Sequence, residues 1–196
     1  MRIIVTFARC FFTTMSTVLK RYTVHFKGLK TGKHIFNFDV DRTFFEQFEG
    51  SLVSNGNLKV EVELDKHTDI LKFSIFIEGN VDVLCDRCLE GFSIPTQYEG
   101  QLAVRISDAI EGEENDDDIW YVSSNENEVS LAQYIYESIC LSLPIKRYHG
   151  MLGTSIEGCD KEMLKKLNML SNGPEESRQK PPADARWDKL KDIYNN

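Results

Sequence analysis

The sequence predicts an α+β fold: a mainly antiparallel β-sheet or partly closed barrel, with a few short helices concentrated in the C-terminal half. Two observations lead to this class. Segments in which apolar and polar residues alternate dominate the first 107 residues, and apolar residues at helical spacing follow from residue 128 onward. A hydrophobic content of 41% in 196 residues is enough for one core with tails.

The expected strands are rich in β-branched and aromatic residues, and their apolar positions recur every second residue. A tight "KHTD" turn joins the third strand to the fourth, and the tip between the fourth and the fifth carries two cysteines. Both connections indicate antiparallel hairpins. The strands are expected at residues 17–29, 34–41, 58–67, 69–85, 92–107 and 119–124.

Three helices are expected where apolar residues recur at helical spacing. Asp41 and Asp160 are candidate N-caps for the first and the last. The middle helix begins between Asn127 and Ser130 and ends at Pro144, because proline cannot continue a helix. The helices are expected at residues 41–50, 128–144 and 160–173.

The composition also suggests domain boundaries. Residues 1–15 are a doubtful N-terminal extension, because Arg9 interrupts an apolar run and Met15 opens an ordinary start; a signal peptide is the alternative. Residues 16–172 are expected to form a single α+β domain. Within it, the acidic loop 107–118 is expected to be mobile, because no apolar periodicity runs through it.

Residues 173–196 combine a proline-bearing linker with a C-terminal amphipathic tail. Trp187, Leu190, Ile193 and Tyr194 could form an amphipathic turn that docks on the domain. No apolar stretch approaches the roughly 20 residues of a membrane span, so we expect a cytoplasmic protein without a membrane partner.

Charge is unevenly distributed along the chain. The net charge is −8, but residues 1–38 contain seven basic and no acidic residues, whereas residues 106–145 contain ten acidic residues and no Lys or Arg. Without those ten acids the net charge becomes +2, so the overall value is a poor guide to the partner. The acidic segment could engage a basic protein or merely solubilise the chain. The candidate cations for RNA phosphates are Lys20, Arg21, Lys27, Lys30, Lys33 and Arg87.

Four residues have the chemistry of a metal site. Cys85 and Cys88 form a Cys-x-x-Cys pair at the predicted hairpin tip, and His149 and Cys159 follow downstream. Zinc takes four such ligands at tetrahedral corners. The long separation is acceptable because the entropy cost of loop closure rises only with the logarithm of loop length. We therefore predict a structural zinc bound by these four residues.

Other interpretations of the cysteines stay open. Leu89 stands where zinc ribbons usually have a glycine, so the pair could be free thiols in a hairpin, and a redox role is weaker because the pair does not open a helix. Five cysteines do not indicate a disulfide framework. The chain lacks a phosphate-binding glycine loop, a nucleophile elbow and a His-Glu-x-x-His motif, so we expect neither an enzyme nor a small-molecule substrate.

The strand leading into "CDRCL", a later helix ending in "LSLP", and then a His and a Cys resemble the YceD family, the large ribosomal RNA subunit accumulation proteins. The resemblance covers most of residues 16–196, and "DARWDKLKDI" is similar to the tail of Bacteroidetes-like members. The spacing between Pro144 and Cys159 is longer than in other members. The matching positions are Cys85, Arg87, Cys88, Leu89, Glu137, Leu141, Leu143, Pro144, His149 and Cys159.

The resemblance implies a cytosolic, non-enzymatic factor that supports normal levels of large-subunit ribosomal RNA. The expected partner is that rRNA or a large-subunit ribosomal protein. The alternative is a protein-only adaptor or chaperone-like module for a basic partner. A small zinc enzyme ranks last, because four protein ligands would leave no open position on the metal.

Overall fold

The computed structural model describes residues 17–107, 119–152 and 158–171. The predicted extension at 1–15, nearly all of the acidic loop 107–118 and the tail 173–196 lie outside these residues. In the described part of the chain no helix is both long and apolar enough to cross a membrane.

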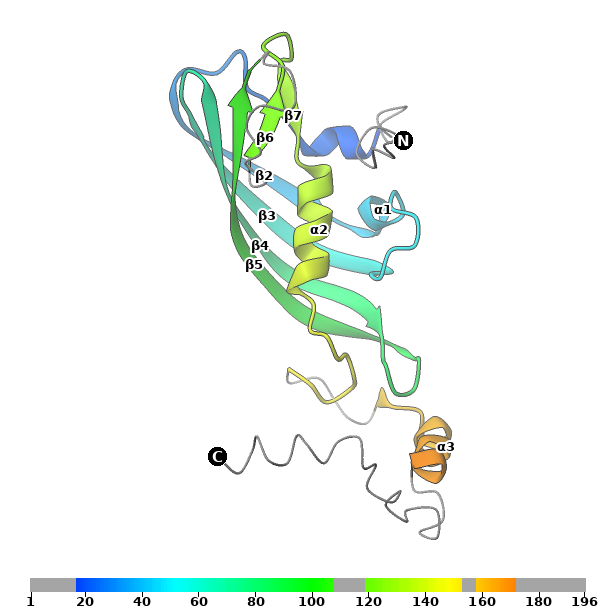
Figure 1. The fold of residues 1–196 in the computed structure, drawn as a ribbon. Coiled ribbons are helices and arrows are strands. Elements are labelled where there is room, and N and C mark those ends of the chain that lie inside the picture. The colour runs from blue at the N-terminus through cyan, green and yellow to red at the C-terminus, as the bar shows by residue number, and fades with distance from the viewer. Residues whose placement is uncertain (1–16, 108–118, 153–157, 172–196) are drawn as a thin grey trace, which may run out of the picture.

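The fold is α+β, as predicted, and its main sheet has five strands in the order β2-β3-β4-β5-β6 (Figure 1). All neighbours pair antiparallel except β5 and β6, which are parallel. A separate two-stranded sheet joins β1 to β7. The strands of the main sheet are β2 (Gly32–Val40), β3 (Asn55–Lys66), β4 (Ile70–Leu84), β5 (Gly91–Ile106) and β6 (Ile119–Val122).

The sheet is open, so the expectation of a partly closed barrel is wrong. Strand β6 covers only Ala103–Ile106 of β5, and β2 forms the opposite edge without reaching it. Helix α2 (Ala132–Ser142) lies across one face of the curved sheet instead (Figure 1). The helix buries Ile135 and Ile139, so it covers apolar surface that closure of a barrel would otherwise enclose.

The first predicted strand is also wrong in part. Residues 17–29 contain a 3₁₀ turn (Leu19–Tyr22) and only a three-residue strand β1 (Thr23–His25), which pairs with β7 (Glu128–Ser130). Tyr22 explains the break: its hydroxyl donates to the carbonyl oxygen of Asp39 at 2.8 Å, and its ring packs in the core.

The predicted helices are confirmed in place but differ at their ends. Helix α1 (Arg42–Phe45) is shorter than expected, although the Asp41 cap is confirmed by the Thr43 N–H, which donates to Asp41 Oδ1 at 2.9 Å. Helix α2 begins after Leu131 without a side-chain cap and ends before Pro144. Helix α3 spans Lys161–Ser171.

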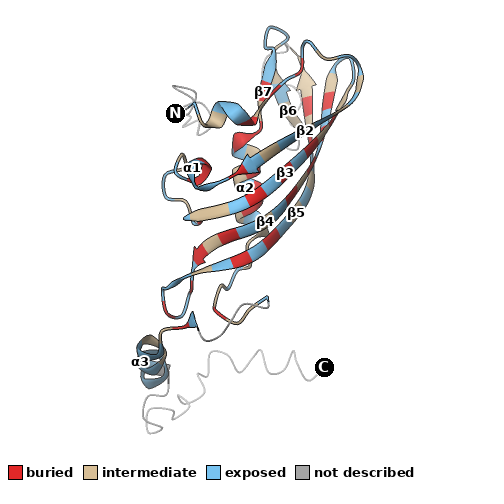
Figure 2. Cartoon of the chain, turned by 180° about the vertical axis from the view of Figure 1, so that it is seen from behind, coloured by how far each residue is buried: buried red, intermediate tan, exposed pale blue. Residues whose placement is uncertain are grey.

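The core lies between the main sheet and α2. Alternate residues of the three central strands face it, which Figure 2 shows as bands of buried and exposed residues along each strand. Phe44, Phe45 and Tyr22 extend this core beside β2. The buried residues of β3 and β4 are Leu58, Val60, Val62, Leu64, Leu71, Phe73, Ile75, Ile77, Val81 and Val83.

The two turns that flank β4 lie at opposite ends of the main sheet. The β3–β4 turn lies at one end of the sheet, and the β4–β5 hairpin tip lies at the other (Figure 1). Strand β4 has 15 residues, which at about 3.3 Å per residue span roughly 45–50 Å. Gly32 pairs with Lys66 beside the β3–β4 turn, so the loop before β2 is far from the hairpin tip.

Gly79 offers a direct test of the sheet register. Its φ is +151°, and a Cβ there would lie 2.2 Å from the carbonyl oxygen of Asn57. We expect Gly79→Ala to lower the free energy of unfolding by about 1–3 kcal/mol, measured by urea denaturation. The control Gly28→Ala has no atom within 4 Å of the new Cβ and should have little effect. Equal effects of the two substitutions would contradict the register.

Candidate metal centre

The first part of the site is the turn between β4 and β5. The Cys85 N–H donates to the Glu90 carbonyl oxygen at 2.9 Å, and the Leu89 N–H donates to the Cys85 carbonyl oxygen at 2.9 Å. Leu89 adopts a left-handed φ of 63°, and its side chain is exposed. A leucine therefore takes the conformation for which glycine is the usual residue, and the turn forms despite the missing glycine.

The segment after α2 is fixed against this turn. The Asp86 N–H donates to the Arg147 carbonyl oxygen at 2.7 Å, and the Arg147 N–H donates to Asp86 Oδ2 at 2.6 Å. The Arg147 guanidinium also lies 3.5 Å from Asp86 Oδ1. Next to this pair, the Arg87 guanidinium lies 4.0 Å from the centre of the Tyr148 ring, a cation–π contact. These contacts place His149 beside the two hairpin cysteines.

The third part is the start of α3. The predicted cap is confirmed, because the Glu162 N–H donates to Asp160 Oδ1 at 2.8 Å. Cys159 therefore precedes a fixed helix terminus. Gly158 allows the close approach, because a Cβ there would lie 2.7 Å from Cδ2 of His149. The three parts thus meet around one point.

The ligand atoms have the separations that a tetrahedral metal needs. Cys85 Sγ lies 4.0 Å from Cys159 Sγ, and His149 Nδ1 lies 3.5 Å from Cys88 Sγ and 3.3 Å from Cys159 Sγ. All four atoms lie within 4.8 Å of one another. Bonds of about 2.3 Å to sulfur and 2.0 Å to nitrogen imply sulfur–sulfur separations near 3.8 Å. The four predicted residues therefore form a cluster that could hold one metal ion.

The four residues of the cluster are buried, which is uncommon for side chains that can ionise. The four side chains are 0–8% exposed, and all described cysteines are free thiols. Phe92, Tyr148, Met163 and Leu164 pack around the cluster, and the Phe92 and His149 ring centres are 4.6 Å apart. The apolar surroundings exclude water, so a bound ion would be held by protein ligands.

The thiols differ in their electrostatic surroundings. Burial raises the pKa of Cys85, but backbone N–H groups of Cys88, Arg87 and His149 outweigh it and hold that pKa at about 6. Burial raises the pKa of Cys159 to about 11, and the neighbouring Cys88 and Cys85 sulfurs contribute to the increase. A metal ion that bound there would displace the proton of Cys159 at neutral pH, so metal affinity should fall as pH decreases.

The predicted RNA-contacting cations do not form one surface. Arg87 lies at the hairpin tip, whereas Lys27, Lys30 and Lys33 lie on the loop before β2 and the start of β2, at the opposite end of the sheet. Lys20 and Arg21 lie on the 3₁₀ turn, beside the last residues of β2. Lys33 is already paired with Glu63 at 2.7 Å, and Lys27 donates to the Ser124 carbonyl oxygen at 3.2 Å. The sequence does not specify the order of the strands, so it could not show that these cations lie far apart.

Several residues that shape the site were missed by the sequence analysis. The Asp86–Arg147 bonds and the Arg87–Tyr148 stack carry no motif, because ordinary polar and aromatic residues supply them. Gly158 gave a usable signal, since a glycine directly before a ligand indicates close backbone approach.

Comparison with protein families decides the relationship of the chain. Residues 73–194, more than half of it, match the family described as "Large ribosomal RNA subunit accumulation protein YceD". The chain belongs to the YceD family. Searches of curated proteins and of solved structures gave no significant match. The match contains all four cluster residues and both α2 and α3, but it begins after Lys20 and Lys33. The similarity of the tail to Bacteroidetes-like members stays a prediction.

We expect each of Cys85→Ser, Cys88→Ser, His149→Ala and Cys159→Ser to lower the metal content of the purified protein about 10-fold or more, because each removes one of four ligands. Elemental analysis measures this. Cys140→Ser is the matched control: Cys140 is half-buried in α2 outside the cluster and should leave the metal content unchanged.

The same variants should lose hydrogen-exchange protection in α3 and the hairpin tip while β3 stays protected. Metal content that is independent of all four residues would contradict the site.

Proposed function

We propose that this YceD-family protein supports large-subunit rRNA accumulation as a non-enzymatic, cytoplasmic factor that carries a structural zinc and binds the rRNA directly. The observation that carries the proposal is the closed Cys/His cluster, which joins the hairpin tip to a basic helix within the matched region. The family description supports the process, and the charges around the cluster favour RNA as the partner.

The ligand set favours zinc. Three thiolates and one imidazole at tetrahedral spacing suit Zn²⁺, which has no geometric demand beyond this arrangement. Four protein ligands leave no position for substrate or water, which is the arrangement of structural rather than catalytic zinc. The proposed role of the metal is therefore to fix the relative positions of the hairpin and α3.

The RNA surface that we propose is called the basic end. It comprises the hairpin tip 85–90, residues 145–152 and α3. The acids there are Asp86, which is bonded to Arg147, Glu90 and Glu162, so six basic residues stand against three acidic ones. The exposed cations of the basic end are Arg87, Lys146, Lys161, Lys165 and Lys166.

Two triple charge reversals test this placement. Changing Lys161, Lys165 and Lys166 to Glu should weaken binding to a large-subunit rRNA fragment and make the salt dependence shallower. Each lost phosphate contact removes about 0.7–0.9 from the slope of log affinity against log salt. Reversal of Lys27, Lys30 and Lys33 is the matched control, with the same charge change at the opposite end of the sheet.

The α3 variant should also fail to restore large-subunit rRNA in a deletion strain, while keeping its metal and its melting temperature. If the Lys27, Lys30 and Lys33 variant is the defective one, RNA binding belongs to the N-terminal cations. If neither reversal changes binding or rRNA level, direct RNA contact through these lysines is wrong.

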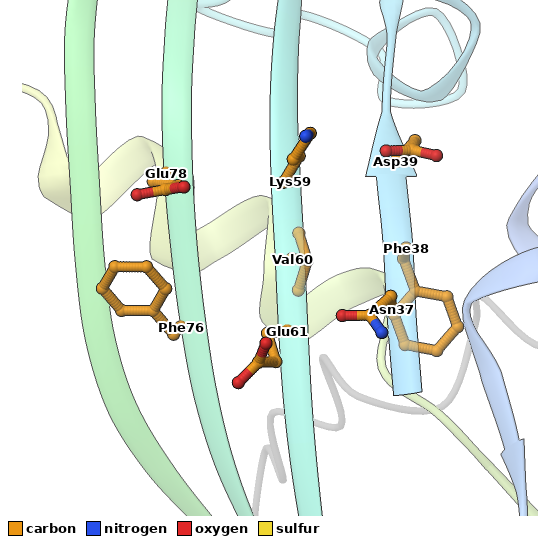
Figure 3. Close-up of a pocket in the computed structure, with 8 residues that line it drawn as sticks. All are labelled: Asn37, Phe38, Asp39, Lys59, Val60, Glu61, Phe76 and Glu78. Atoms are coloured by element: carbon orange, nitrogen blue, oxygen red, sulfur yellow. The ribbon is translucent and has the colours of Figure 1, made fainter. Parts of the chain in front are cut away.

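A specific observation favours the second candidate, an adaptor for a basic protein. The sheet face turned away from α2 carries more acids than cations. A hollow of about 370 Å³ on this face is lined by three carboxylates, together with Lys59, Asn37 and the half-buried Phe76 (Figure 3). The charged residues on this face are Asp39, Glu61, Glu63, Asp65, Glu78, Asp82 and Glu99 against Lys33, Lys59, Lys72 and Arg105.

A further inference from the structure

Exposed apolar side chains are most frequent in the elements near the metal centre. Among the described residues, eleven large hydrophobic side chains are exposed, and eight of them belong to the end of β4, to the hairpin tip, to residues 141–152 or to α3. Exposed apolar surface that is concentrated in one region indicates an interaction surface. The eight residues are Leu84, Leu89, Leu141, Ile145, Leu152, Leu167, Met169 and Leu170.

Helix α3 shows this most clearly. Met163 and Leu164, in its first turn, pack against the cysteine cluster. Leu167 and Leu170 continue the same helical face at spacings of three and four residues, but they are 41% and 84% exposed. Figure 2 shows α3 projecting past the hairpin with exposed residues along its length. Its apolar face is therefore covered at the start and uncovered at the end.

The chain itself supplies a matching segment. Twenty-five residues follow Ser171, and among them Trp187, Leu190 and Tyr194 recur at three and four residues, the spacing of an apolar helical face. Fifteen residues separate Ser171 from Trp187, and at about 3.3 Å per residue they reach up to about 50 Å, enough to return to α3. The family match extends to residue 194 and so includes this segment.

We propose that residues 184–196 dock on the uncovered apolar face of α3, with Trp187 and Leu190 covering Leu167 and Leu170. The C-terminal segment then completes the surface around the metal centre. A second copy of the chain is the competing occupant, and the experiment below distinguishes it from docking within one chain.

Tryptophan fluorescence tests this docking in the full chain. The chain has two tryptophans, so Trp120→Phe leaves Trp187 as the sole reporter. Its emission maximum should lie to the blue of that of a free 173–196 peptide, and acrylamide should quench it several-fold less. Adding Leu167→Asp and Leu170→Asp should move both values to those of the peptide.

The matched control is the pair Ile35→Asp and Leu52→Asp, two exposed apolar residues outside the basic end, at 62% and 59% exposure. This pair of substitutions should leave the emission maximum and the acrylamide quenching of Trp187 unchanged. Emission and quenching equal to the free peptide in the parent protein would overturn the proposal. So would a blue shift that disappears on dilution together with a halving of the mass in light scattering, because the segment would then dock on a second copy.

Discussion

The arrangement of this protein depends on one constraint: two thiols of a hairpin tip must meet an imidazole and a third thiol that follow much later in the chain. Cys85 and Cys159 are 74 residues apart in sequence, yet their sulfur atoms lie 4.0 Å apart. Few apolar side chains support this contact, chiefly Phe92, Tyr148, Met163 and Leu164. A metal ion, whose binding free energy in small structural sites is on the order of 10 kcal/mol, is the strongest available link.

The main core is physically separate from this link. It lies between α2 and the sheet, and its buried Leu, Ile, Val and Phe side chains require no metal. The protein therefore combines a self-sufficient α+β body with an end whose geometry rests on the cluster. Helix α3 makes few contacts with this body. It is positioned near Arg87 by the cysteine cluster, against which Met163 and Leu164 pack.

The sequence predicted the elements well where periodicity was strong. The alternation of Leu58, Val60, Val62 and Leu64 specified β3 and its buried face, because a strand has only two faces. The four cluster residues were also predictable, since Cys-x-x-Cys at a hairpin tip requires partners and few were available. Tertiary contacts decided the rest. The 3₁₀ turn that closes at Tyr22 replaced the start of the first predicted strand, α2 took the place of barrel closure, and strand order placed Arg87 far from Lys33.

The most direct test of the account is X-ray absorption spectroscopy at the zinc edge on the untagged, full-length protein. The account predicts one zinc per chain with three sulfur ligands at about 2.3 Å and one nitrogen ligand at about 2.0 Å. That set requires the hairpin tip, the segment after α2 and the start of α3 to meet. A protein without zinc, or a first shell with two sulfurs and added oxygen ligands, would contradict it.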